Sequence, residues 1–549
     1  MNSTLKNRVV RSLSVHLDSW STLSVILVIG ILSPLILVTR GIFLPVNETF
    51  SHLMDTVLTE YVINTFIICI GVGIFTSVIG VGTAWFVSVY EFPLRRFYSW
   101  GLILPLAIPT YIAGYIYGDM FSYTGSIMYL LRKYLGYNKN IDIMNIWGVI
   151  GIFTFFFYPY VFIVMKSFFA KESSTMIEAS QSLGKSMGTT FFKIILPLSR
   201  VSLVGGVSLV LMEVLNAYGL VSHFGVTTFS TGIFRTWLSL GDLDASIKLS
   251  SILVVIVFAI LNLEKAFRGR RSYSFSSTKV KPIKRRTLSR GKALAISGVC
   301  TLIFAIGFAI PVIQLLAWAR VTYTYFDYEE LLEVLGNSLS VTLLASIIIV
   351  VVAVIIANSV RLNKLSLSKF LSKGANLGYS IPGAVIAIGV MSMFIGVDRK
   401  FQGFYRLMGI DKTLVLSSSF VILVFAYMVR FLAVPYNSIE SGFDKVGVKF
   451  HEASRTFGFG VTKTFMKVDF PMIKSSIGGA LILVFIEIVK ELPLTLILRP
   501  FNFQTLSTFI QQYANDEMIQ ESSIPSLLLV GMCAVAVYAF TNMSKKKES

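Results

Sequence analysis

Apolar stretches of about 20 residues recur from one end of the chain to the other, and a helix of that length can cross the hydrocarbon core of a bilayer. Hydrophobic residues make up 54% of the 549 residues and charged residues only 14%, which is too little polar surface for a water-soluble protein. We therefore predict an all-α integral membrane protein. Twelve spans are expected, beginning near residues 21, 61, 98, 146, 200, 248, 293, 337, 375, 413, 475 and 523.

Lysine and arginine residues gather between alternate apolar stretches. If both termini are cytoplasmic, most of the 48 basic residues lie on the cytoplasmic side of the lipid bilayer, as the positive-inside rule requires. This placement explains the formal net charge of +19, and we expect no nucleic-acid partner. The first apolar stretch, from about Ser24 to Val38, runs on without a small-residue cleavage site, so we expect it to remain as the first span.

Two water-facing segments of one pattern lie half a chain apart. EASQSLGKSMGTTFFKIILP covers residues 178–197 and EASRTFGFGVTKTFMKVDFP covers residues 452–471, an offset of 274 residues. Nearly the same offset relates Asn64 to Asn337, Pro109 to Pro382, and Glu213 to Glu487. We infer a six-span unit that occurs twice in parallel, related by an axis along the membrane normal. The two membrane halves are residues 1–264 and 293–549, and residues 265–292 form a basic, serine-rich cytoplasmic linker.

Each repeated segment is predicted to form a short helix, a sharp bend and a second short helix on the cytoplasmic face. Thr175 and Glu178 fit a capping box that would start the first helix of copy one, whereas copy two has Lys449 at that place. Gly184 and Gly458 permit a bend that a residue with a Cβ atom would resist. A proline ends each segment and suits the first turn of the following span.

The pattern E-A-(A/S)-x-x-x-G with a distant I-x-L-P resembles the EAA loop of ABC importer membrane subunits. In that family this loop is a coupling helix that docks into a groove on a cytoplasmic ATPase subunit. The resemblance implies a type I ABC importer-like fold with MetI-like domains. It also implies a non-catalytic permease that works with two copies of an ATPase subunit, which bind the ATP and Mg. The residues assigned to ATPase coupling are Glu178, Ala179, Gly184, Pro197, Glu452, Ala453, Gly458 and Pro471.

Two further stretches, LMEVLNAYGLVSHFGVTTFSTGIFRTW and KELPLTLILRPFNFQTLSTFIQQYANDE, resemble the fused ferric-iron permeases of that family. The likeness implies that a periplasmic binding protein delivers ferric iron for transport across a bacterial inner membrane. Thiamine, polyamine, phosphonate and sulfate remain alternative substrates. The chain departs from the family pattern at Ser180 and Ser454, where alanine is usual, and at Phe470, where leucine is usual.

Four ionisable residues fall inside predicted spans: Glu213 in the fifth, and Glu487, Lys490 and Glu491 in the eleventh. A charged group at membrane depth costs about 3 kcal/mol on insertion scales, so it normally faces a partner or a watery path. Glu487 and Lys490 share a helix face and could neutralise each other at a helix interface. Alternatively, the carboxylates flank the translocation path, where they would tolerate Fe(III) but bind it weakly enough for release.

Other reactive residues indicate no separate site. The three cysteines and four histidines are scattered, so we expect no fixed metal site and no cofactor in this chain. Residues 184–186 read GKS, but the first glycine of a phosphate-binding loop is missing. Four tyrosines at the third span are expected in the interfacial belt: Tyr111, Tyr115, Tyr117 and Tyr123.

A secondary transporter of the major-facilitator type is the main alternative function, since it also has six plus six spans and a basic central loop. Such proteins usually carry a GxxxDRxGRR-like loop after the second span, where this chain reads EFPLRRF. The conspicuous loops here follow the fourth and tenth spans instead. A channel or a membrane enzyme fits less well, because neither a selectivity-filter-like repeat nor a catalytic group of residues is present in the sequence.

Overall fold

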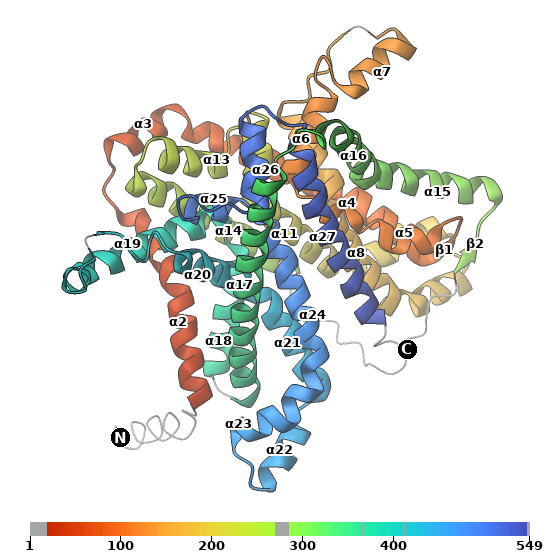
Figure 1. Cartoon of the computed structure of the whole chain (residues 1–549). Coiled ribbons are helices and arrows are strands. Elements are labelled where there is room, and N and C mark those ends of the chain that lie inside the picture. The colour runs from red at the N-terminus through yellow and green to blue at the C-terminus, as the bar shows by residue number, and fades with distance from the viewer. Residues whose placement is uncertain (1–18, 138, 269–284, 364–365, 411, 546–549) are drawn as a thin grey trace.

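The structure is a computed structural model, and it describes residues 19–137, 139–268, 285–363, 366–410 and 412–545. The described part is almost entirely helical (Figure 1). Seven of its helices are long and apolar enough to cross a membrane, and four bent helix pairs raise the number to as many as eleven. A shorter apolar helix, Ser523–Ala539, lies at the position expected for the twelfth span. The predicted all-α membrane fold is therefore confirmed.

The elements follow the chain in two similar series. The first series is α2 Ser19–Arg40, η1 Gly41–Phe43, α3 Glu48–Thr56, α4 Leu58–Val89, β1 Tyr90–Glu91, α5 Arg95–Gly101, η2 Leu104–Ala107, α6 Thr110–Met120, α7 Ser126–Leu135, α8 Ile146–Ser182, α9 Met187–Thr190, η3 Phe191–Ile195, α10 Leu196–Leu198, α11 Arg200–Asn216, α12 Gly219–His223, α13 Phe229–Phe234, η4 Arg235–Ser239 and α14 Leu243–Arg268. The second series is β2 Arg286–Thr287, α15 Arg290–Phe304, η5 Ala305–Ala309, α16 Ile310–Thr322, α17 Tyr328–Leu362, α18 Ser366–Leu377, η6 Gly378–Ser380, α19 Gly383–Leu407, α20 Phe420–Phe431, α21 Ala433–Val446, α22 Lys449–Thr456, α23 Val461–Thr464, η7 Phe465–Asp469, α24 Phe470–Val489, α25 Pro493–Leu498, α26 Leu506–Asn515 and α27 Ser523–Lys545.

Two of the bends fall at the matched prolines Pro109 and Pro382. The helices on either side of the break meet at 89° in the first half and at 113° in the second. The isoleucine before each proline has an extended backbone, as the proline ring requires, and a new helix begins just after the proline. Hydropathy does not reveal these bends, because an Ile-Pro pair leaves the apolar stretch unbroken in the sequence.

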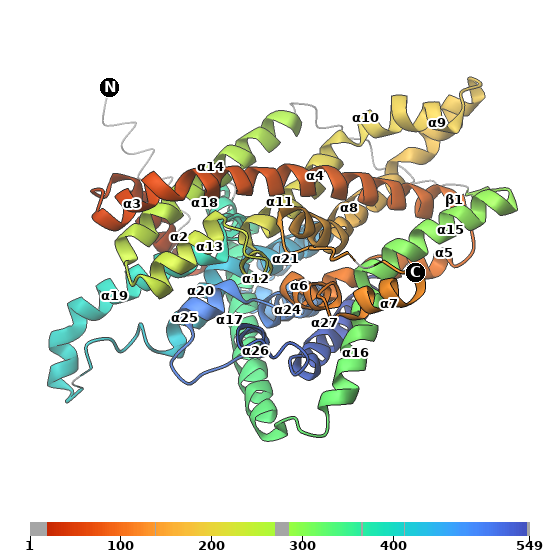
Figure 2. The same ribbon diagram turned by 90° about the horizontal axis from the view of Figure 1, so that it is seen from above.

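The two halves exchange their first spans. Helix α2 packs against α17, α18 and α19, which belong to the second half, and the Oγ atoms of Ser24 and Ser359 are 2.7 Å apart. Reciprocally, α15, η5 and α16 pack against α5, η2 and α6 of the first half, where the Tyr98 hydroxyl lies 2.6 Å from Thr301 Oγ1. Figures 1 and 2 show α2 beside the second-half helices, and α15 and α16 beside α5 and α6. The first span of each half thus packs against helices of the other half.

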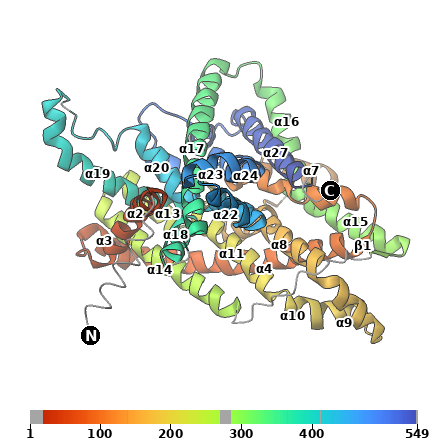
Figure 3. The ribbon, with the colours of Figure 1, turned by 90° about the horizontal axis from the view of Figure 1, so that it is seen from below.

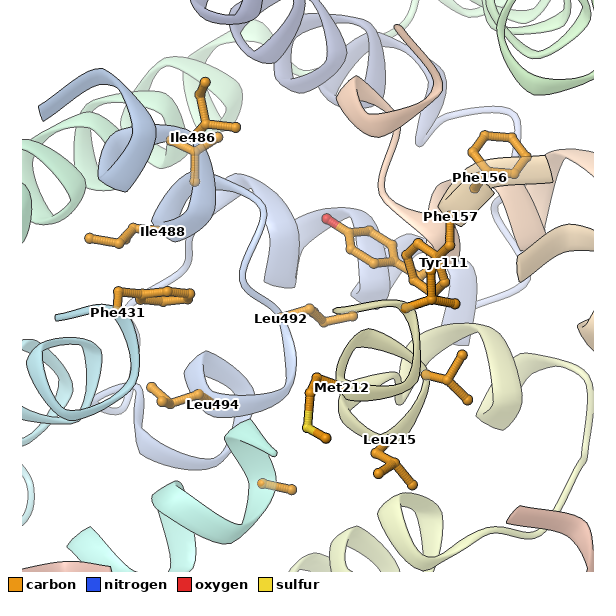
Figure 4. Packing of buried hydrophobic residues seen from close by; sticks show 14 of the residues in the cluster. Tyr111, Phe156, Phe157, Met212, Leu215, Phe431, Ile486, Ile488, Leu492 and Leu494 are labelled. Carbon is orange, nitrogen blue, oxygen red and sulfur yellow. The ribbon is translucent and has the colours of Figure 1, made fainter. Parts of the chain in front are cut away.

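A single cluster of buried hydrophobic residues extends through both halves. Figure 4 shows part of it at the boundary, where Tyr111, Phe157 and Met212 of the first half approach Phe431 and Leu492 of the second. The cluster is continuous across this boundary, so the described halves form one core. The predicted linker, residues 265–292, lies mostly outside the described residues, but its end forms β2, which pairs in parallel with β1.

Candidate functional site

The first repeated segment, residues 178–197, is called lobe one. Helix α8 continues unbroken from Ile146 to Ser182, so the prediction that a helix begins after Thr175 is wrong: the fourth span itself extends into the lobe. The chain then turns at Gly184, whose φ of +75° lies in the left-handed region that favours glycine. Helix α9, the π-helical turn η3 and α10 follow, and Pro197 stands in the first turn of α10.

The second repeated segment, residues 452–471, is called lobe two. Here a separate helix, α22, follows a break at Gly447, as the prediction of a short first helix required. The bend again lies at a left-handed glycine, Gly458, with a φ of +82°. A π-helical turn, η7, occupies the same relative place as η3, and Pro471 stands in the first turn of α24. The predicted bend and proline positions are therefore present in both copies.

A side-chain hydrogen bond closes each lobe across its bend. The Oγ atom of Ser180 is 2.8 Å from Thr190 Oγ1, and that of Ser454 is 3.1 Å from Thr464 Oγ1. All four hydroxyls belong to buried residues, and each pair is related to the other by the same offset of 274 residues. The serines that depart from the usual alanine thus have a structural role, because they fix the second helix of the lobe against the first.

Each lobe presents apolar side chains at its tip. Leu183 in lobe one is 79% exposed and Phe457 in lobe two is 83% exposed, immediately before the bend glycine in both cases. Phe192 and Met466 form a second exposed pair with the same offset. Figures 1 and 2 show lobe two (α22, α23) and lobe one (α9, α10) projecting from edges of the molecule. Single exposed apolar side chains are common on proteins, so what distinguishes these is their recurrence at the same place in both lobes.

Around these apolar tips the lobes also expose the residues singled out in the sequence. Glu178 and Ala179 are exposed in lobe one, and Glu452 and Ala453 are exposed in lobe two. Sequence reasoning did not select the apolar tips, although the recurrence of an apolar residue just before both bend glycines was the signal that could have identified them.

A cavity of about 80 Å³ lies between the halves and collects all four ionisable residues predicted inside spans. It holds a few water molecules by volume. Glu213 comes from the end region of α11, and the other three come from the end of α24 and the turn that follows it (Figure 3 labels both helices near the centre of the view). The lining includes Tyr111, Tyr160, Glu213, Asn216, Arg430, Glu487, Lys490 and Glu491.

Two of the three carboxylates that line this cavity form ion pairs, and the third does not within the described residues. Lys490 Nζ lies 3.0 Å from Glu487 Oε1, and Arg430 Nε lies 3.4 Å from Glu491 Oε2. Glu213 has no cation at this distance among the described residues, and it accepts a long hydrogen bond of 3.5 Å from the hydroxyl of Tyr379. The predicted pairing of Glu487 with Lys490 is therefore present, and Glu491 is paired with Arg430, whereas Glu213 lines the cavity with only a weak partner.

Arg430 lies in α20, is 4% exposed, and donates to the carbonyl oxygen of Ile381 at 3.0 Å. One expectation about this region is wrong. Tyr111, Tyr115 and Tyr117 are buried rather than placed in an interfacial belt, because α6 turns inward after its bend. Within the described residues, no group of three His, Cys, Asp or Glu side chains is arranged to hold a metal ion.

Comparison with known proteins bears on this architecture. Residues 76–263, which include lobe one and Glu213, match the family described as "Binding-protein-dependent transport system inner membrane component". These residues form a domain of that permease family. The chain is also similar over nearly its full length to a permease of Haemophilus influenzae, the Fe(3+)-transport system permease protein FbpB 2. The identity is 24% over 527 residues, which covers 94% of this chain and 97% of its relative.

Partial relatives match shorter portions of the permease. A probable sulfate transport system permease protein, cysT, of Chlorokybus atmophyticus is 28% identical and covers 38% of this chain and 73% of its own length. The sulfate transport system permease protein CysT of Escherichia coli is 27% identical, with coverages of 36% and 73%. A solved bacterial alginate ABC transporter, in complex with an alginate pentasaccharide-bound periplasmic protein, is 15% identical; it covers 47% of this chain and 95% of the other, with a TM-score of 0.38.

Proposed function

We propose that this permease is the membrane subunit of an ATP-driven importer that carries ferric iron from a periplasmic binding protein across a bacterial inner membrane. The observation that carries the proposal is the pair of matched lobes, each with an exposed apolar tip. Because the two lobes repeat one geometry, they suit two copies of one ATPase subunit, which would supply ATP and Mg. Both termini and both lobes then lie in the cytoplasm.

The cavity between the halves suits a closed stage of the path. Residues of both halves line it, so a movement of one half against the other would change its size and its access. Two of its three carboxylates have a cationic partner, so the cavity offers cargo only a weak hold, as a path that must release its cargo requires. Glu213 is the carboxylate with the least compensation, and we assign it the first contact with a cationic cargo.

Ferric iron is favoured because the ferric-iron permease from Haemophilus influenzae matches 94% of the chain, whereas the sulfate permeases named above match less than two fifths of it. The substrate test is reconstitution of the permease and its ATPase in lipid nanodiscs, with iron-loaded and sulfate-loaded periplasmic binding proteins added separately. We expect only the iron-loaded protein to stimulate ATP hydrolysis. Stimulation by the sulfate-loaded protein alone would overturn the iron assignment and leave the importer assignment standing.

The coupling test replaces both apolar tips, as Leu183→Asp with Phe457→Asp. Both side chains are exposed, so the fold should not depend on them, whereas a charged group would oppose burial in an apolar groove of the ATPase. We expect the ATPase to be lost on purification of the double variant. A matched control is Leu407→Asp, which alters a similarly exposed leucine at the end of α19, away from either lobe. Retention of the ATPase by the double variant would contradict the assigned docking surface.

A further inference from the structure

The buried carboxylate of Asp469 joins lobe two to the membrane helix α17. Asp469 is 0% exposed; Arg361 donates to its Oδ1 atom at 2.9 Å, and Nδ1 of His451 lies 2.6 Å from its Oδ2 atom. The three residues come from η7, α17 and α22 respectively. One carboxylate therefore ties both parts of the lobe to the cytoplasmic end of a span.

The arginine of this cluster also reaches a fourth element. Its guanidinium carbon lies 4.6 Å from the centre of the Phe443 ring, which belongs to α21. Arg361 and His451 are themselves almost fully buried, so solvent screens these interactions little. Charge-assisted hydrogen bonds of this kind are directional, and a buried charge that loses its partner is strongly unfavourable. The junction should therefore hold one geometry.

Lobe one has a different junction at the corresponding positions. The residues 274 positions before His451 and Asp469 are Ile177 and Ile195, and both are buried. The residue 274 positions before Phe443 is Phe169, which contacts the Trp85 ring of α4 at 5.4 Å between ring centres. Apolar contact is not directional, so these side chains fix the orientation of lobe one against its neighbours less strictly than paired charges would.

The helices that follow the two lobes also differ: the chain bends after lobe one but continues straight after lobe two. In the first half, Met187–Leu198 and Arg200–Asn216 meet at 68°, so the chain bends between lobe one and the fifth span. In the second half, Val461–Val489 is one continuous span candidate that begins inside lobe two. On the leaving side, a displacement of lobe two is thus passed directly to α24, whereas a displacement of lobe one can be absorbed at its bend. On the entering side the order is reversed, because α8 runs unbroken into lobe one and lobe two follows a break at Gly447, and the Asp469 cluster is what bridges that break.

We propose that Asp469, held by Arg361 and His451, is a positioning residue that makes lobe two a rigid coupling element, while lobe one is compliant at its apolar junction. This inference rests on the proposed coupling of the lobes to an ATPase. It predicts that the two lobes are unequal in transport, although their bends and tips match. The rigid lobe transmits the movement of its ATPase subunit to α17 and α24 together.

The first experiment transplants the junction of lobe one into lobe two. The triple variant Arg361→Met/His451→Ile/Asp469→Ile replaces the charged cluster with apolar side chains and copies the two isoleucines of lobe one. Replacing a buried ionic cluster with apolar groups commonly preserves stability, whereas Asp469→Asn alone leaves a buried arginine without its carboxylate. We therefore expect the single variant to lower the Tm of the purified complex and the triple variant to recover it.

Transport separates a positioning role from a purely structural one. We expect the triple variant to retain its ATPase but to import about tenfold less iron per ATP hydrolysed than the unmodified complex. The matched control is Asp444→Asn, which changes an exposed aspartate on the neighbouring α21 and should leave import unchanged. A triple variant with full Tm recovery and full import would overturn the inference, because the cluster would then serve stability alone.

A second measurement needs no substitution. Hydrogen exchange in the unmodified permease–ATPase complex should be slower in residues 449–469 than in residues 177–195, by about tenfold in protection. Equal protection, or slower exchange in lobe one, would overturn the inference even if the triple variant failed to fold. An unmodified permease that retains no ATPase would instead overturn the proposed function, and the inference with it.

Discussion

The side-chain oxygen of Asn216 accepts a hydrogen bond from the backbone N–H of Gly383 at 2.7 Å, and this bond joins the end of α11 in the first half to the start of α19 in the second. Gly383 directly follows the proline at which the ninth span bends, and both residues adjoin the central cavity through Arg430 and Glu491. The contact therefore links the boundary between the halves to the charged groups inside it.

Gly383→Ala should weaken this boundary. An added Cβ atom would lie 2.8 Å from Glu491 Oε1 and 3.0 Å from Asn216 Oδ1, so the hydrogen bond and the Arg430–Glu491 pair would have to shift. We expect a loss of about 1–3 kcal/mol in stability, the usual cost of overpacking, read as a lower Tm in detergent. Gly396→Ala in the same helix is the control, because a Cβ atom there meets nothing within 4 Å. Equal Tm values for the two variants would contradict the prediction.

Gly184→Ala with Gly458→Ala should impair coupling rather than folding. Both glycines have a left-handed backbone, and a Cβ atom added at either would meet open space, so the cost is conformational, about 1–2 kcal/mol for each residue. The second helix of each lobe would then be displaced, and iron import should fall while the ATPase still copurifies. Gly188→Ala, at an open position in α9 without a positive φ, is the control and should import normally. Unimpaired import by the double variant would rule out this account of the bends.

Glu213→Gln with Glu487→Gln should reduce import by removing the least compensated carboxylate and the partner of Lys490. The remaining cavity would carry an excess of positive charge, which opposes a cationic cargo. A rise of about 1.4 kcal/mol in the barrier to entry would correspond to a tenfold lower rate, measured as iron uptake into proteoliposomes. Glu333→Gln, on an exposed position of α17, is the control. Normal uptake by the double variant would show that these carboxylates do not contact the cargo.

Ser180→Ala with Ser454→Ala should loosen both lobes slightly. Each substitution removes one buried hydroxyl-to-hydroxyl bond, worth about 0.5–1.5 kcal/mol, and leaves the threonine partner in place. We expect faster amide exchange in residues 187–195 and 461–469, with import largely retained, since alanine is compatible with the bend. Ser182→Ala is the control, because this exposed serine donates to the carbonyl oxygen of Glu178 in its own helix. Unchanged exchange in the double variant would argue against a closing role for these bonds.

The positions of the spans and lobes could be predicted from the sequence because they depend on local properties. Apolar length places a span, and Gly184 and Gly458 mark bends that few other residues adopt. The burial of Arg430 could not be found in this way, since it lies at the end of an apolar stretch and is compensated by Glu491, which is 61 residues away in the chain. Likewise, the inward position of Tyr111 depends on a bend that hydropathy does not register.

The packing of each first span against the other half could not be predicted from the sequence either, because an internal repeat shows which segments are similar and not which segments are in contact. This packing has a consequence for how the protein is made. When α2 emerges from the ribosome, the second-half helices against which it packs are still about 300 residues from being synthesised, so α2 is inserted in the lipid before these partners exist. The first half cannot complete its own packing until α15 and α16 arrive. After folding, α2 is packed in the second half and α15 and α16 are packed against the first half. Proteolytic cleavage of the linker should therefore leave the two fragments associated.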